Sequence, residues 1–138
     1  MRVMAIDYGD ARTGIAVSDP TGTLTGFTTV LSAYQPDVLA EQIAALAQER
    51  GAEELVLGFP KNMDGTLGPR AEKAVELAEI LRARTGLVVT LWDERRTTID
   101  AWQILHANGK RAKKGKQTVD AVAASLILEG YLARKKSL

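Results

Sequence analysis

The chain has 138 residues, of which 46% are hydrophobic and 25% charged, as in an ordinary globular protein. We therefore expect a single domain over residues 1–138 with its own core. No cysteine is present, which excludes disulfides, thiolate nucleophiles and sulfur-based zinc sites. No apolar run approaches about 18 residues, so we expect no membrane-spanning segment and a cytoplasmic location.

The formal net charge of +1 conceals an uneven distribution. Residues 1–100 hold 10 Lys or Arg against 15 Asp or Glu, whereas residues 101–138 hold 8 against 2. Most of the basic excess lies in GKRAKKGKQ, residues 109–117. Such a segment favours a polyanionic partner, although a solvated lysine-rich loop explains the same charges equally well.

Strand patterns come first along the chain. RVMAIDYG (2–9) and RTGIAVSD (12–19) are short, apolar and separated by turn-forming residues, so they predict a β-hairpin. TLTGFTTVL (23–31) is rich in threonine and β-branched residues and predicts a third strand. Such short connections predict antiparallel pairing of these three strands.

Helical periodicity follows. Two amphipathic helices are predicted, because apolar residues recur at helical spacing and the runs end in Gly51 and Gly86. Apolar runs before and after the second helix predict two more strands, and two further helices are expected towards the C-terminus. The expected ranges are 36–51 (helix), 53–60 (strand), 70–86 (helix), 87–92 (strand), 97–107 (helix) and 118–133 (helix).

This order, β-β-β-α-β-α-β-α-α, predicts an α/β fold with a mixed five-stranded sheet. The first three strands are expected to be antiparallel. The later two are each reached through a helix, so they are expected to be parallel, with right-handed crossovers and helices on the sheet faces.

Three acids fall at the ends of predicted elements. Asp7 lies at the carboxyl end of the first strand, Glu94 lies at the carboxyl end of the last, and Asp120 lies about one residue inside the final helix. In open α/β sheets, functional groups gather at the carboxyl ends of central strands. Clustered carboxylates without nearby His or Cys suit Mg²⁺ or Mn²⁺, whose charge offsets their mutual repulsion. Strand alternation turns only one of Asp93 and Glu94 towards such a site, and we favour Glu94.

Each acid also has a purely structural interpretation. Asp7 could be a turn acid, and Asp120 could serve only as a charge near a helix N-terminus. Glu94 could pair with Arg12, Arg95 or Arg96. The position of all three acids at element ends favours the metal site over these separate explanations.

The segment DYGDARTG, residues 7–14, is not a P-loop, because Ile15 and Ala16 follow Gly14 where Lys and Ser or Thr are required. A second strand follows it, which excludes the strand–turn–helix of a dinucleotide-binding turn. We expect a tight hairpin that lets a phosphate backbone approach Asp7.

Four segments resemble, in order, the blocks of the YqgF/RuvX family, proposed Holliday-junction resolvases of the ribonuclease-H-like superfamily. The resemblance extends over nearly the whole chain. The resemblance implies a ribonuclease-H-like fold, catalytic roles for Asp7, Glu94 and Asp120, and phosphate-facing roles for Arg12 and the loop around Asn62–Thr66. The segments are AIDYGDARTGIAVSD, LGFPKNMDGTLGPRA, DERRTT followed by Ala101, and VDAVAASLILEGYL.

We therefore expect a nuclease that hydrolyses phosphodiesters with two Mg²⁺ or Mn²⁺ ions, about 3.5–4 Å apart, and no protein nucleophile. The main expectation is a resolvase of branched DNA, acting as a homodimer because a junction has two symmetric strands to cut. Alternatives are a ribonuclease that matures the 5′ end of pre-16S rRNA and a non-catalytic ribosome assembly factor that binds nucleic acid. An ATP-dependent phosphotransferase of the actin/sugar-kinase superfamily is less favoured, because 138 residues cannot supply its second domain.

Nucleic-acid contacts are predicted from basic and polar residues near the acids and in the basic segment. Tyr8 could stack on a base, although a packing role is equally well supported. The predicted contacts are Tyr8, Arg12, Asn62, Thr66, Arg95, Arg96, Lys110, Arg111, Lys113, Lys114 and Lys116.

Overall fold

The computed structural model describes residues 1–9, 12–32, 35–59, 68–93 and 116–136. Their helices and strands follow the predicted order, and the helix expected at 97–107 lies outside the described residues. The elements are β1 (Val3–Tyr8), β2 (Thr13–Ser18), β3 (Thr25–Leu31), α1 (Pro36–Arg50), β4 (Glu54–Phe59), α2 (Pro69–Thr85), β5 (Val88–Asp93) and α5 (Lys116–Lys136).

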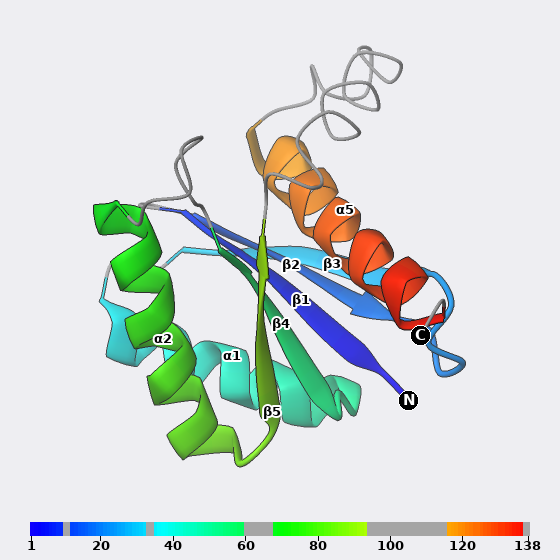
Figure 1. The fold of residues 1–138 in the computed structure, drawn as a ribbon, viewed down its shortest axis with the longest axis horizontal. Coiled ribbons are helices and arrows are strands. Elements are labelled where there is room, and N and C mark those ends of the chain that lie inside the picture. The colour runs from blue at the N-terminus through cyan, green and yellow to red at the C-terminus, as the bar shows by residue number, and fades with distance from the viewer. Residues whose placement is uncertain (10–11, 33–34, 60–67, 94–115, 137–138) are drawn as a thin grey trace.

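The described strands form one five-stranded sheet in the order β3-β2-β1-β4-β5 (Figure 1). β2 pairs antiparallel with both β1 and β3, as short connections require. β4 pairs parallel with both β1 and β5, and a helix precedes each of these two later strands. The predicted mixed sheet is confirmed, and β1 is its central strand.

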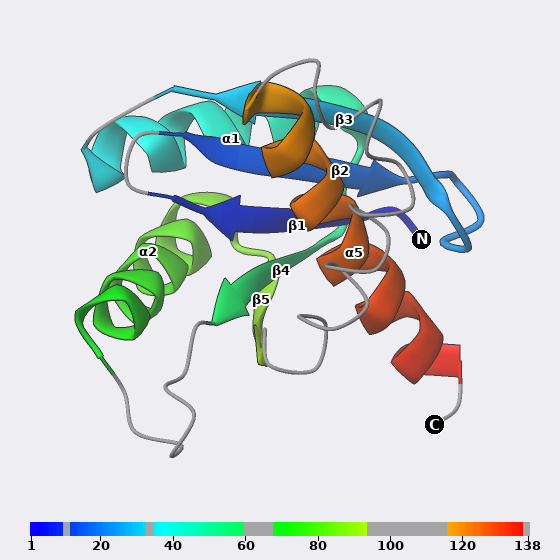
Figure 2. The same ribbon diagram turned by 90° about the horizontal axis from the view of Figure 1, so that it is seen from above.

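Helices cover both faces of the sheet (Figure 1, Figure 2). α1 and α2 pack on one face, around a core that includes Ile6 and Leu77. α5 packs on the other face, around a core that includes Ala5, Ala16 and Leu128. The small side chains of Ala5 and Ala16 let α5 lie close to β1 and β2, which determines where the first turns of this helix reach the sheet.

The predicted helix stops are confirmed at both positions. Gly51 has φ 70° and Gly86 has φ 69°, and each closes its helix in the left-handed conformation that glycine adopts without strain. Both helices also begin with a proline, Pro36 or Pro69, whose fixed φ suits the first helical position. No helix among the described residues is both long and apolar enough to cross a bilayer.

Candidate active site

Asp7 lies near the carboxyl end of β1, on the face of the sheet that α5 covers. Successive strand residues alternate between the faces. Ile6 belongs to the core beneath α1 and α2, whereas Val3 and Ala5 belong to the core beneath α5. Asp7 continues the series of Val3 and Ala5, and it is half-buried. The predicted position at the end of a central strand is therefore confirmed.

Asp120 reaches the same place from the other end of the chain. In the sheet, Asp7 is paired with Gly14 of β2. A Cβ atom added at Gly14 would lie 2.1 Å from the carbonyl oxygen of Asp120 and 3.4 Å from the Cβ of Ala124. The early turns of α5 therefore rest on Gly14, immediately beside Asp7. The structure brings these two acids together, as expected from their positions at element ends.

The expected position of Asp120 within its helix is wrong. α5 begins at Lys116 and has no acidic residue in its first turn, so Asp120 lies two residues further in than predicted. The predicted range starts at Thr118, but the helix also includes the two preceding residues, Lys116 and Gln117, both of which favour helical structure. Because the dipole effect fades within the first turn, the helix N-terminus no longer explains an acid at this position.

Arg12 supplies a positive charge beside Asp120. Its Nε lies 3.3 Å from Oδ2 of Asp120, and the two side chains are 34% and 27% exposed. The N–H is not directed at Oδ2, however, and this buried oxygen has no hydrogen-bond partner among the described residues. A buried carboxylate oxygen without a donor is unfavourable, so a bound cation would satisfy an atom that the protein leaves unsatisfied.

Asp7 and Asp120 therefore fit a divalent cation as two of its ligands, since Mg²⁺ and Mn²⁺ prefer carboxylate oxygens. Within the described part of the chain, no group of three Asp, Glu, His or Cys side chains comes together to hold a metal. The third predicted ligand, Glu94, lies outside that part. Trp92 belongs to the core beneath α5, so strand alternation places Asp93 towards the opposite face and keeps Glu94 as the candidate.

Tyr8 lies on the face opposite to Asp7. It packs against the core beneath α1 and α2, and with Gly9, Arg70 and Lys73 it lines a shallow depression. The structure thus shows a packing contact for Tyr8, and its stacking on a base stays a prediction. The described part of the chain includes Arg12 and the backbone of Lys116. The other predicted contacts lie outside it, namely Asn62, Thr66, Arg95, Arg96, Lys110, Arg111, Lys113 and Lys114.

The sequence analysis did not single out Arg70 and Lys73, although the predicted order of strands and helices could have indicated their position near the acids. A helix that follows a parallel strand begins at the carboxyl edge of the sheet, where functional groups gather. α2 follows β4, which is parallel to the central strand β1. Basic residues in the first turns of α2 are therefore expected beside the end of β1, where the structure places Arg70 and Lys73.

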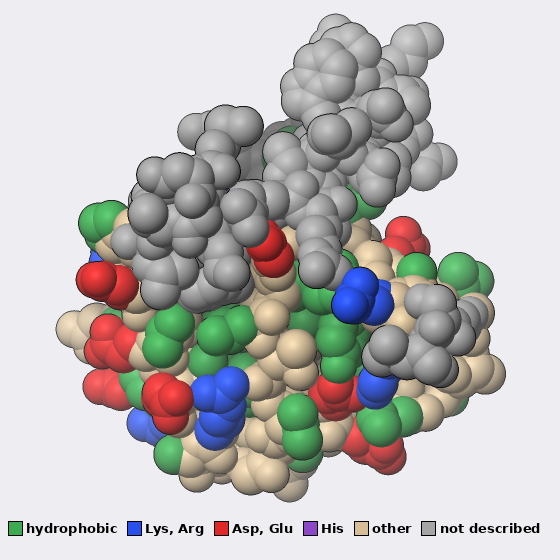
Figure 3. Space-filling view, in the orientation of Figure 1, with side chains coloured by type: hydrophobic (Ala, Val, Ile, Leu, Met, Phe, Trp, Pro, Cys, Tyr) green, Lys and Arg blue, Asp and Glu red, His purple; other side chains and the backbone are tan. Residues whose placement is uncertain are grey.

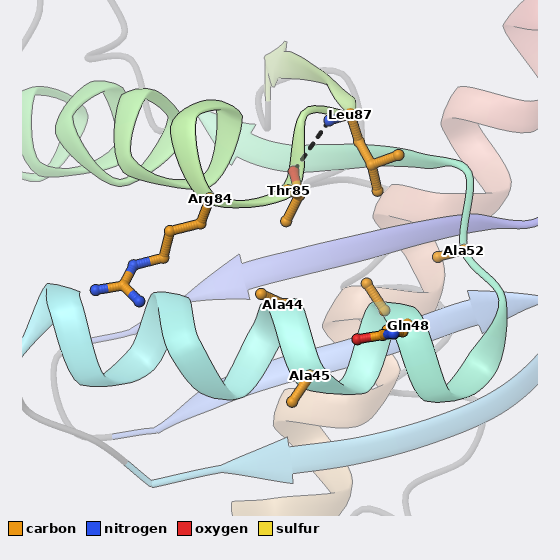
Figure 4. Close-up of a pocket in the computed structure, with 8 residues that line it drawn as sticks. Ala44, Ala45, Gln48, Ala52, Arg84, Thr85 and Leu87 are labelled. Atoms are coloured by element: carbon orange, nitrogen blue, oxygen red, sulfur yellow. Dashed lines mark hydrogen bonds between the residues drawn. The ribbon is translucent and has the colours of Figure 1, made fainter.

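A second hollow lies at the opposite edge of the sheet. It has a volume of about 340 Å³ and lies between the later turns of α1 and the end of α2 (Figure 4). The small side chains of Ala44 and Ala45 line this hollow and do not fill it. At its border, the Leu87 N–H donates a hydrogen bond to Oγ1 of Thr85, 3.1 Å away. Because Leu87 precedes β5, this hollow is at the amino ends of the parallel strands, away from Asp7 and Asp120.

The described surface on the face shown in Figure 3 mixes acidic, basic and apolar side chains. On that face, the described residues form no broad field of one sign. Attraction of a polyanion to the described surface there would depend on individual basic side chains near the acids, not on a general positive potential.

Comparison with known proteins identifies the family. Residues 1–134 match the family described as "RuvX: Holliday junction resolvase". A curated relative from Acetivibrio thermocellus, named "Putative pre-16S rRNA nuclease", is 44% identical over 137 residues, which cover 98% of this chain and 97% of that one. A relative from Halothermothrix orenii with the same name is 41% identical over 138 residues, which cover 100% and 99%.

Among solved structures, RuvC from T. thermophilus in complex with a Holliday junction substrate is similar, with a TM-score of 0.66. It is 15% identical, and the match covers 99% of this chain and 97% of RuvC, so the likeness establishes the fold. The family match does not support the actin/sugar-kinase alternative, and the likeness to a ROK hexokinase from Thermus thermophilus, with a TM-score of 0.51 at 22% identity, concerns the fold alone. The family match over residues 1–134, together with the curated relatives, shows that this protein belongs to the RuvX family, a family of nucleases with the ribonuclease-H-like fold.

Proposed function

We propose that this protein is a divalent-metal-dependent endonuclease that cleaves the 16S ribosomal RNA precursor during maturation of its 5′ end. The observation that carries the proposal is the meeting of Asp7 and Asp120 at Gly14, on the carboxyl edge of the sheet. Two acids that the backbone brings to the same strand position, one of them with a buried oxygen that lacks a donor among the described residues, suit cation binding better than a purely structural role.

Asp7 and Asp120 would hold the metal, with Glu94 as the predicted third ligand. When bound, divalent cations lower the pKa of a water and stabilise the oxygens of an in-line phosphodiester hydrolysis. The protein itself supplies the placement of the ligands. β1 positions Asp7, and the close contact of α5 with Gly14 positions Asp120. No protein nucleophile is needed, which agrees with a chain that has no cysteine.

Basic side chains on either side of the acids would position the substrate backbone. Arg12 lies beside Asp120 on the α5 face, and Arg70 and Lys73 line the depression next to Gly9 on the α2 face. A strand that crosses the end of β1 would meet both groups in succession. Such contacts to phosphate fix the register of the substrate without reading its sequence.

Structured RNA is favoured over a DNA junction as the substrate. The curated relatives that match nearly the whole chain are named as pre-16S rRNA nucleases, whereas RuvC, at 15% identity, supports only the fold. The family description keeps a junction resolvase as the second candidate. A resolvase would require a twofold dimer, so a monomer in sedimentation at micromolar concentration would favour the RNA nuclease.

The decisive experiment offers the purified protein a labelled precursor-rRNA fragment and, separately, a labelled four-way DNA junction. Each is incubated with Mn²⁺, Mg²⁺ or chelator, beside Asp7→Asn and the matched control Asp19→Asn, whose carboxylate instead accepts hydrogen bonds in the turn after β2. We expect metal-dependent cleavage of the RNA that Asp7→Asn abolishes and Asp19→Asn retains. Paired nicks in the junction alone would instead establish a resolvase, and binding without cleavage would indicate an assembly factor.

A further inference from the structure

We propose that Arg12 couples metal binding to nucleic-acid binding. In the free protein, its guanidinium acts as the counter-charge of Asp120. When a divalent cation takes that role, Arg12 becomes available to a phosphate of the nucleic acid. The inference rests on the proposed function, because it assumes that Asp120 is a metal ligand.

The first argument is geometric. Arg12 immediately precedes β2, and its backbone is held against the β1–β2 hairpin, where a Cβ atom added at Gly9 would lie 2.3 Å from the carbonyl oxygen of Arg12. The base of the side chain is therefore fixed beside the acids. The side chain as a whole is 34% exposed, so the guanidinium has room to turn from Asp120 towards a ligand in solvent.

The second argument concerns the strength of the pair. Nε of Arg12 lies 3.3 Å from Oδ2 of Asp120, yet the N–H is not directed at that oxygen, which has no hydrogen-bond partner in the described part of the chain. The two groups therefore interact mainly through charge. A partly exposed contact of this kind is weak and easily exchanged, unlike a bidentate pair with two aligned hydrogen bonds.

The third argument is electrostatic. A cation bound to Asp120 would lie close to the guanidinium, and an arginine cannot relieve the repulsion by losing its proton. It can do so by moving to a phosphate, whose oxygens match the planar guanidinium. Metal would then strengthen nucleic-acid binding, and nucleic acid would strengthen metal binding by the same factor, as linkage requires.

A plain structural ion pair makes a different prediction. If Arg12 only fastens α5 to the sheet, then Arg12→Gln lowers thermal stability, and a divalent cation tightens RNA binding by the same factor in the variant as in the native protein. If Arg12 is exchanged between Asp120 and a phosphate, Arg12→Gln binds metal more tightly in the absence of nucleic acid and gains less RNA affinity from the cation. The metal affinity and the cation-dependent gain in RNA affinity together therefore separate the two roles.

The test is a titration of the full chain with Mn²⁺ alone, followed by electron paramagnetic resonance. We compare the native protein with Arg12→Gln, and use Arg12→Met as a second neutral variant should the first fail to fold. Arg84→Gln is the matched control, because it removes the same charge near the far end of α2. We expect the Arg12 variants to bind Mn²⁺ about fivefold more tightly and Arg84→Gln to bind as the native protein does.

A second measurement uses a labelled precursor-rRNA fragment, with Ca²⁺ or chelator, and follows its fluorescence anisotropy. We expect Ca²⁺ to tighten RNA binding by the native protein, and by a smaller factor in the Arg12 variants. Equal Mn²⁺ affinity in native and Arg12 proteins, weaker affinity in the variants, or an equal gain in Arg84→Gln would overturn the coupling alone. Absence of Mn²⁺ binding in all of them would overturn the proposed metal site as well.

Discussion

The carbonyl oxygen of Asp120 lies directly over the α-carbon of Gly14, so close that a Cβ atom there would be 2.1 Å from it. Gly14 is in turn the strand partner of Asp7. One position without a side chain thus allows two acids more than one hundred residues apart to meet. Gly14 has no positive φ, so the requirement for glycine is one of space and not of backbone conformation.

The first prediction is that Gly14→Ala separates the two acids. Real Cβ atoms do not approach a backbone oxygen to 2.1 Å, so α5 must shift away from β2. Overpacking of this kind costs about 1–3 kcal/mol of unfolding free energy. A displacement of about 1 Å at catalytic groups lowers the rate by roughly a hundredfold. Urea unfolding and single-turnover cleavage measure the two effects.

Gly26→Ala is the matched control for that variant. Gly26 lies in the neighbouring strand β3, and an added Cβ would be 3.4 Å from its nearest neighbours, the Cα and backbone nitrogen of Asp19. We expect its cleavage rate to stay within about twofold of the native one, because surface changes of this kind have small effects. Full cleavage by Gly14→Ala would show that the contact with α5 does not position Asp120.

The second prediction concerns the acids themselves. Asp7→Asn and Asp120→Asn keep the shape of each side chain but remove its charge. We expect each to lower the cleavage rate by more than about a hundredfold, which exceeds the usual effect of losing a side chain that only hydrogen-bonds to a metal ligand. Circular dichroism should show unchanged folding, and RNA binding in chelator should persist. Normal cleavage and metal dependence in Asp7→Asn would refute the metal site.

Local chemistry explains why part of this arrangement could be predicted. Asp7 was found because an apolar strand ends there, and the helix stops were found because Gly51 and Gly86 follow periodic runs. The contact of Gly14 with Asp120 could not be found in this way, because it depends on how closely a distant helix packs. The start of α5 was misplaced by two residues because Lys116 and Gln117 belong to the basic segment 109–117, which was expected to be a loop.

The third prediction concerns the contact of the C-terminal end of α5 with β4, which we call the anchor and which consists of Glu54, Tyr131 and Lys135. Glu54 is only 7% exposed, and its carboxylate accepts hydrogen bonds from Tyr131 and, at 2.5 Å, from Nζ of Lys135. Tyr131→Phe removes one donor from this carboxylate, so we expect the free energy of unfolding to fall by about 1–2 kcal/mol. The anchor is remote from Asp120, so cleavage under conditions where the variant is folded should be retained, and its loss would contradict this separation.

The same anchor predicts a loss of stability in alkali. The hydrogen bond to Glu54 raises the pKa of Lys135 above its ordinary value of 10.5. Burial, followed by the bond to Glu54, raises the pKa of Tyr131 above 10.0. Because both pKa values are raised, the folded state retains these two protons to higher pH than the unfolded chain does. The stabilisation is therefore complete below pH 10.0 and falls as pH rises through the raised values. Urea unfolding across this range should show a smaller loss for Lys135→Met, and equal losses would exclude this cause.

The last prediction tests the substrate path on the α2 face. Arg70→Ala combined with Lys73→Ala removes two positive charges beside the end of β1. We expect RNA binding to weaken at low salt. The magnitude of the slope of log affinity against log salt should fall by about one to two units, because fewer phosphate contacts form and fewer counterions are released on binding. Arg84→Ala, near the end of the same helix, should leave both quantities unchanged, since it lies at the far edge of the sheet. An unchanged slope in the double variant would confine the substrate to the α5 face, where Arg12 and Asp120 lie.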